Sequence, residues 1–107
     1  MAWMYVFLAG LCEIGWAVGL KYTEGFTKVT PSVATIATMA LSMWLLSRAL
    51  QELPIGTAYA IWTGIGAVGT AIIGMAFMGE PRQALRILCI GLIVAGMLGL
   101  KVTAPAN

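Results

Sequence analysis

The sequence contains no histidine and no aspartate, and only four glutamates and six basic residues among 107. Without histidine, the chain lacks the usual side chain for acid–base chemistry near neutral pH and a common metal ligand. We find no nucleophile–base pair, metal-ligand cluster or phosphate-binding loop. We therefore expect no enzyme activity, no metal and no cofactor. The net charge of +2 is too small and too scattered to predict a nucleic-acid partner.

Cysteine is also scarce. Cys12 and Cys89 both lie in apolar segments, and two such distant residues make neither a disulfide framework nor a metal motif. We expect both to pack between helices as small apolar side chains.

Charged residues are rare as well, because they make up 9% of the chain, against about 25% in soluble domains. Hydrophobic residues make up 61%. Four apolar segments have about the 20 residues that a membrane-spanning helix needs, at about 2–20, 31–50, 54–78 and 84–102. The sequence predicts an all-α, multi-pass membrane protein in which residues 1–107 form one four-helix domain in the lipid bilayer.

The ends of these segments support this interpretation. Pro31 is expected at the first position of its helix, where a missing N–H costs nothing. No basic residue precedes the first apolar run, which is longer than the core of a signal peptide, so we expect a retained helix.

The distribution of basic residues gives a weak orientation signal. Four spans place both termini on one face, and Lys and Arg near the membrane favour the cytoplasmic side. The face with the termini has two basic residues and the opposite face has four, namely Arg48 and Lys101 against Lys21, Lys28, Arg82 and Arg86. Such a small difference permits insertion in both orientations.

Glu13 stands out because it lies near the middle of the first span. A charge at the centre of a bilayer costs at least about 2.5–3.5 kcal/mol. Lys21 is about 12 Å away along a helix, and the other basic residues lie at span ends. The carboxylate must therefore take its countercharge from a proton or from a cation outside the chain, in mutually exclusive fashion. The alternative is a protonated glutamic acid that only packs between helices.

Helical spacing places Gly10 and Trp16 on the same stripe as Glu13. The small residue leaves room for a group to approach the carboxyl, and the indole stands one turn further on. Mid-depth in the second span, Ser42 has two possible acceptors, which are Glu13 and the backbone of its own helix.

The third span presents Tyr59 and Trp62 on the face that also carries Gly66 and Gly69. Aromatic rings attract cations, and the phenol and indole can donate hydrogen bonds to a carboxylate. The alternative is ordinary packing or an interface belt. The glycine-dense run at 64–69 indicates either close contact with a neighbouring helix or a bend.

The fourth span carries small residues at every fourth position, Gly91, Ala95 and Gly99. Such a ridge lets helix backbones approach closely in lipid. We expect a contact between two copies of the chain, and packing within one copy is the alternative.

Taken together, the sequence resembles the small multidrug resistance family. The resemblance covers the whole chain and is carried by "CEIGWAVGLKYTEGF" at 12–26 and "LPIGTAYAIWTGIGAVGTAIIG" at 53–74. Gly10, Trp16, Ser42 and "WTGIGA" at 62–67 fit the guanidinium exporter subtype better than the quaternary-ammonium subtype.

The resemblance implies a proton-coupled antiporter in the bacterial inner membrane that exports guanidinium and small substituted guanidinium cations. It implies an antiparallel homodimer with dual topology, in which Glu13 of each subunit binds either protons or one cation. Residues Trp16, Tyr59 and Trp62 would line the site, and Ser42 would hydrogen-bond to the carboxyl. Three alternatives remain open: an exporter of quaternary ammonium cations, a non-transporting membrane subunit and a passive cation channel.

Overall fold

The structure, a computed structural model, describes residues 1–104, which contain four helices. These are α1 (Ala2–Tyr22), α2 (Val29–Ala49), α3 (Ile55–Phe77) and α4 (Ala84–Val102). All four are long and apolar enough to cross a membrane. The predicted all-helical class is confirmed, and each helix begins and ends within two residues of its predicted span.

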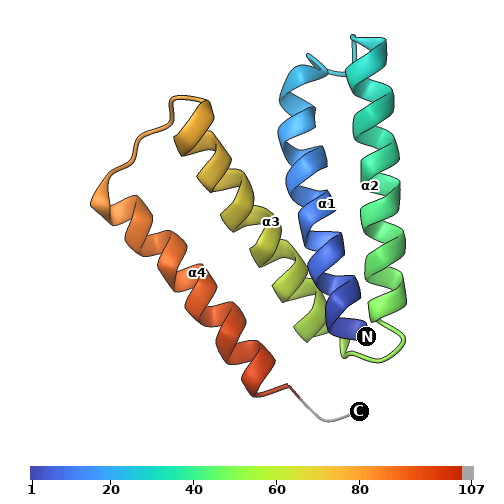
Figure 1. The fold of residues 1–107 in the computed structure, drawn as a ribbon, viewed down its shortest axis with the longest axis vertical. Helices are drawn as coiled ribbons and strands as arrows, with labels where there is room; N and C mark the ends of the chain where they lie inside the picture. Colours follow the sequence, from blue (N-terminus) through green and yellow to red (C-terminus); the bar gives the residue numbers. More distant parts are fainter. Residues whose placement is uncertain (105–107) are drawn as a thin grey trace.

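The helices form two pairs. Figure 1 shows α1 and α2 side by side, while α3 and α4 tilt away from them as a second pair. Helix α1 packs against both α2 and α3, whereas the backbone of α4 runs close to that of α3 alone. The start of α1 and the end of α4 lie at the same end of the bundle as the α2–α3 connection (Figure 1). We call this end the terminal face.

Helix α2 begins at Val29, two residues earlier than predicted. Pro31 therefore lies inside the first turn and not at the first helical position. The turn tolerates it because the first N–H groups of a helix have no acceptor within the helix.

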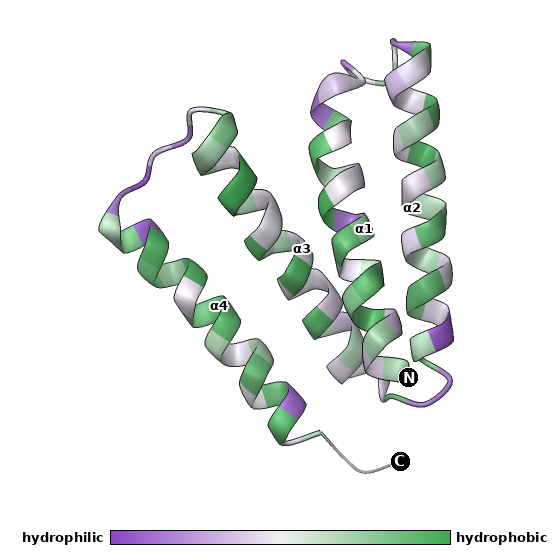
Figure 2. Cartoon of the chain, in the orientation of Figure 1, coloured by the Kyte–Doolittle hydropathy of each residue, from purple (hydrophilic) through white to green (hydrophobic). Residues whose placement is uncertain are grey.

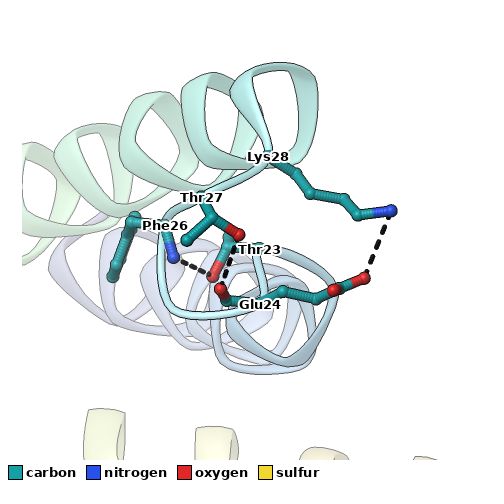
Figure 3. A network of polar contacts seen from close by, with 5 residues as sticks. All are labelled: Thr23, Glu24, Phe26, Thr27 and Lys28. Atoms are coloured by element: carbon teal, nitrogen blue, oxygen red, sulfur yellow. Dashed lines mark hydrogen bonds and ion pairs between the residues drawn. The ribbon is translucent and has the colours of Figure 1, made fainter.

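Local hydrogen bonds hold the connection between α1 and α2 (Figure 3). The Oγ1 of Thr23 accepts a bond from the N–H of Phe26 at 3.2 Å, and Thr27 donates to the carbonyl of Glu24 at 2.8 Å. The carboxylate of Glu24 lies 3.2 Å from the ammonium of Lys28. Glu24 and Phe26 have φ of 48° and 66°, and such left-handed residues reverse the chain within a few residues.

The buried core lies where α1, α2 and α3 meet. Its members are apolar side chains from these three helices: Val6, Ala9, Leu45, Leu46, Ala49, Ala58, Ile61 and Trp62. Helix α4 contributes no buried residue. Green, hydrophobic residues recur along all four helices, whereas the strongly hydrophilic residues gather mainly in the connections and at helix ends (Figure 2). Most apolar side chains thus face outward, toward lipid or another chain.

The two cysteines differ in their surroundings. Cys12 is half-buried and packs against the core, as predicted. The same prediction is wrong for Cys89, which is exposed on α4, because the backbone of this helix runs close to α3 alone in the described chain.

Candidate functional site

Glu13 lies on the face of α1 that packs against α3. Its carboxyl group occupies the space beside Gly66, where an added Cβ would overlap it. The next residue, Ile14, occupies the corresponding space at Gly69. Because α3 is one unbroken helix from Ile55 to Phe77, these glycines serve to admit side chains of α1.

Gly10 has the reverse arrangement. Its small size admits the side chain of Ile65 from α3, which an added Cβ would overlap. The sequence predicted open space at this position, one turn before Glu13. In the folded chain a neighbouring side chain takes that space, so Gly10 sets how closely α1 and α3 approach.

A buried hydrogen-bond network joins α1, α2 and α3 one turn before Glu13. Ser42 donates to the carbonyl of Ala9 at 2.7 Å. The indole N–H of Trp62 donates to Ser42 Oγ at 3.0 Å and to the same carbonyl at 3.2 Å. Ser42 and Trp62 are almost fully buried, so each satisfies its donor inside the core.

This network differs from the predicted one. The sequence left Ser42 two acceptors, Glu13 and its own helix, and the resemblance favoured Glu13. The sequence also offered the indole of Trp62 as a donor to a carboxylate. Both side chains instead bind a backbone carbonyl of α1, because the carboxyl of Glu13 faces Gly66 on α3. Ala9 carries no functional side chain, so no signal marks it in the sequence beyond its place four residues before Glu13.

Two buried polar atoms beside this network have no hydrogen-bond partner among the described residues. They are Oε1 of Glu13 and the indole nitrogen of Trp16, one turn later on α1. Within residues 1–104 the structure has two ion pairs, Glu24–Lys28 and Glu80–Arg86. Neither includes Glu13, so its charge is uncompensated in the single chain.

Tyr59 lies at the edge of the site. Its ring centroid is 5.5 Å from that of Trp62, at an interplanar angle of 52°. Tyr59 is 54% exposed whereas Trp62 is 5% exposed. The aromatic pair therefore extends from the core of the chain to its outer surface, where a second molecule can contact Tyr59.

The predicted ridge on α4 lies apart from these residues. Gly91, Ala95 and Gly99 are all exposed, and nothing lies within 4 Å of a Cβ added at either glycine. Packing within one copy, the alternative considered for this ridge, does not occur in the described chain.

Comparison with known proteins identifies the group to which these features belong. Residues 1–93 match the family described as Small Multidrug Resistance protein. The chain belongs to the small multidrug resistance family. This confirms the resemblance seen in the sequence. The chain is thus a multi-pass protein of the bacterial inner membrane that works in transport.

Several members of the family are similar to this chain over nearly its full length. A guanidinium exporter of Salmonella typhimurium is 59% identical over 104 residues, which cover 97% of this chain and 99% of the relative. A guanidinium exporter of Citrobacter freundii is 56% identical, covering 96% and 98%. A third, from Yersinia pseudotuberculosis, is 55% identical, covering 97% and 100%. All three names describe transporters.

Proposed function

We propose that this chain is a proton-coupled antiporter that exports guanidinium and small substituted guanidinium cations. In this proposal Glu13 binds either protons or the cation, and never both. Proton entry then releases the cation on one side of the membrane, and the cation displaces protons on the other.

The observation that carries the proposal is the unpaired carboxyl of Glu13. One of its oxygens is buried without a hydrogen-bond partner, and neither ion pair of the described chain includes it. A buried carboxylate needs a countercharge, and intramembrane carboxyl groups usually serve transport or proton transfer. A proton and an organic cation satisfy the same need, which is why they exclude one another.

Guanidinium fits such a site. It is planar and permanently charged, and it forms paired hydrogen bonds with a carboxylate. The relatives named guanidinium exporters, at 55–59% identity, support this substrate class. The exposed ring of Tyr59, backed by Trp62, offers an aromatic face for the same cation.

The remaining predicted residues have supporting roles in this proposal. Ser42 and Trp62 hold the backbone of α1 one turn before Glu13 through the carbonyl of Ala9. The unpaired indole N–H of Trp16 is free to donate to the carboxylate of a second subunit or to a bound water.

We further propose that the working unit is an antiparallel homodimer. One chain leaves α4 without a buried residue and Tyr59 on the surface. A second copy can cover both, with the ridge of Gly91, Ala95 and Gly99 as the contact. The weak bias of basic residues is compatible with insertion in both orientations.

Transport by purified protein in liposomes tests the mechanism. A proton gradient should drive guanidinium accumulation, and Glu13→Gln should abolish it because the amide takes up no proton. Glu52→Gln is the matched control, since Glu52 is exposed in the α2–α3 connection. Retained exchange in the Glu13→Gln variant would refute the proposal, and proton-independent currents would indicate a channel. Absence of flux in the unmodified protein would favour a non-transporting subunit.

The alternative substrate class is a bulky quaternary ammonium cation. Its N-alkyl groups cannot donate hydrogen bonds to Glu13, so we expect guanidinium to be transported and tetraalkylammonium ions to be rejected. Electrical recording from proteoliposomes with each cation at two pH values separates the two substrates. Larger currents with tetraalkylammonium than with guanidinium would indicate an exporter of quaternary ammonium cations.

Labelling of a single cysteine tests the dual topology. Cys12 and Cys89 are replaced by serine, and Thr27→Cys places a thiol in the exposed α1–α2 connection. Membrane-impermeant maleimide should label about half of the molecules from each side of the membrane. Labelling from one side alone would contradict this part of the proposal and leave the chemistry of Glu13 untouched.

A further inference from the structure

Three helices border an apolar pocket close to the terminal face. The pocket has a volume of about 240 Å³. Its lining comes from α1, α3 and α4 and includes Trp3, Phe7, Ile61, Ile65, Met97 and Lys101. Neither Glu13 nor Ser42 lines it, so this Lys101 pocket is separate from the candidate transport site.

One basic side chain, that of Lys101, lies at the edge of this apolar lining. The ammonium of Lys101 lies 5.1 Å from the ring centroid of Trp3. Lys101 takes part in neither of the two ion pairs found in residues 1–104. It occupies the last turn of α4, at the end of a membrane span, where the headgroups of lipids lie.

We propose that the Lys101 pocket binds an anionic phospholipid of the surrounding bilayer. The headgroup phosphate contacts the ammonium of Lys101, and part of an acyl chain lies along Phe7, Ile65 and Met97. Basic pockets between membrane helices commonly bind anionic headgroups. The apolar lining matches an acyl chain, and the volume is below the roughly 300–1,000 Å³ of pockets for drug-sized ligands.

The pocket is open to lipid. Phe7 and Leu98, which both border it, are 54% and 59% exposed. Met97 and the ridge lie on nearly opposite sides of α4, because Gly99 is about 160° around the helix from Met97. Leu98, by contrast, is only about 20° around the helix from Gly91, at the margin of the ridge. A dimer formed through the ridge therefore leaves the Met97 side of the pocket accessible, while Leu98 lies at the border of the dimer contact. If the proposed antiparallel dimer holds, one such pocket faces each leaflet.

Native mass spectrometry of the purified protein tests this inference without any measurement of transport. The protein is extracted from vesicles with equal amounts of phosphatidylglycerol and phosphatidylcholine of identical acyl chains. We expect one retained phosphatidylglycerol per chain in preference to phosphatidylcholine. Lys101→Gln should lower this retention about fivefold, and Lys101→Arg should preserve it.

Arg48→Gln is the matched control. It removes one positive charge from the same face, where Arg48 lies against Tyr5 and Trp44 and not in the pocket. Equal losses in the Arg48 and Lys101 variants would overturn the proposal, because they would indicate nonspecific attraction to the membrane surface. Equal retention of both lipids by the unmodified protein would overturn it as well, even if a variant failed to fold. Neither result bears on Glu13 or on guanidinium export.

Discussion

Two helix surfaces in this molecule are rich in small residues, and they differ in whether neighbouring side chains fill the space beside those residues. On α3, Gly66 and Gly69 are filled by side chains of α1, including the carboxyl group of Glu13. On α4, the spaces beside Gly91 and Gly99 are empty in the described chain. The sequence alone makes the two surfaces look alike, although one is completed inside a single chain and the other is left open.

This difference separates the part of the site that a single chain completes from the surface that requires a second chain. The contact of α1 with α3 positions Glu13 and anchors its helix through the Ala9 carbonyl. Helix α4 runs close to α3 alone along most of its length and has no buried residue, so its apolar surface is available for association. We therefore expect changes at the α1–α3 contact to impair the site directly, and changes on the α4 ridge to impair assembly first.

The largest effect is expected from Gly66→Ala. The added methyl group overlaps the Glu13 carboxyl and forces it or α3 to move. The overlapped carboxyl is the end of a flexible side chain, so it can move at little cost in stability, but the displaced carboxyl should stop guanidinium transport. Thermal unfolding in detergent and liposome flux measure the two effects. Gly96→Ala, at a position with open space, should keep both stability and flux. Normal flux in the Gly66 variant would contradict the role given to this glycine.

Ser42→Ala should have the next largest effect. It removes the donor to the Ala9 carbonyl and one acceptor of Trp62 in a fully buried place. The loss of such a buried partner costs about 1–3 kcal/mol. Ser47→Ala is the control, because Ser47 donates to a carbonyl of its own exposed helix turn. Unfolding curves of the two variants should differ clearly, and equal curves would show that the network contributes little.

Gly99→Leu tests the open surface. A large side chain on the ridge should raise the dissociation constant of the dimer by about tenfold, the equivalent of about 1.4 kcal/mol. The secondary structure of the chain should not change, because nothing in the described chain contacts Gly99. Energy transfer between labelled chains in vesicles measures association. Gly96→Leu lies about 60° around the helix from Gly99 and about 140° from Gly91, so it should weaken association clearly less. Similar losses from both substitutions would refute the ridge as the contact.

The smallest effect is expected outside both surfaces. Lys28→Gln breaks the ion pair with Glu24. The side chains of Lys28 and Glu24 are 57% and 63% exposed. Exposed pairs contribute up to about 1 kcal/mol and often nothing measurable. We expect unchanged transport and a shift in unfolding that disappears at high salt. A loss of flux would mean that the α1–α2 connection takes part in the conformational change.

Much of the fold follows from the sequence because the apolar segments have the length of membrane spans. Their helices begin and end within two residues of the expected positions. Pro31 did not mark the start of α2, since the first turn of a helix accepts proline at more than one position. The family was also recognisable, because its motifs are continuous stretches around Glu13 and Trp62.

The contacts of the site were less predictable. Helical spacing brought Gly10, Glu13 and Trp16 to one stripe but carried no information on what faces it. The side chain of Ile65 fills the space at Gly10, and Ser42 binds the backbone of another helix. These outcomes depend on how α1, α2 and α3 cross, and the crossing is set by side chains that are distant in the sequence.

The sequence by itself determined the membrane setting, the four helices and the isolation of Glu13, because hydropathy, length and the scarcity of charge are local properties. The tertiary structure alone decided which glycines are filled, which acceptor Ser42 and Trp62 use, and which surfaces stay open. Close packing explains this division: each of these outcomes depends on the shape of a neighbour that is brought into contact only when the helices assemble.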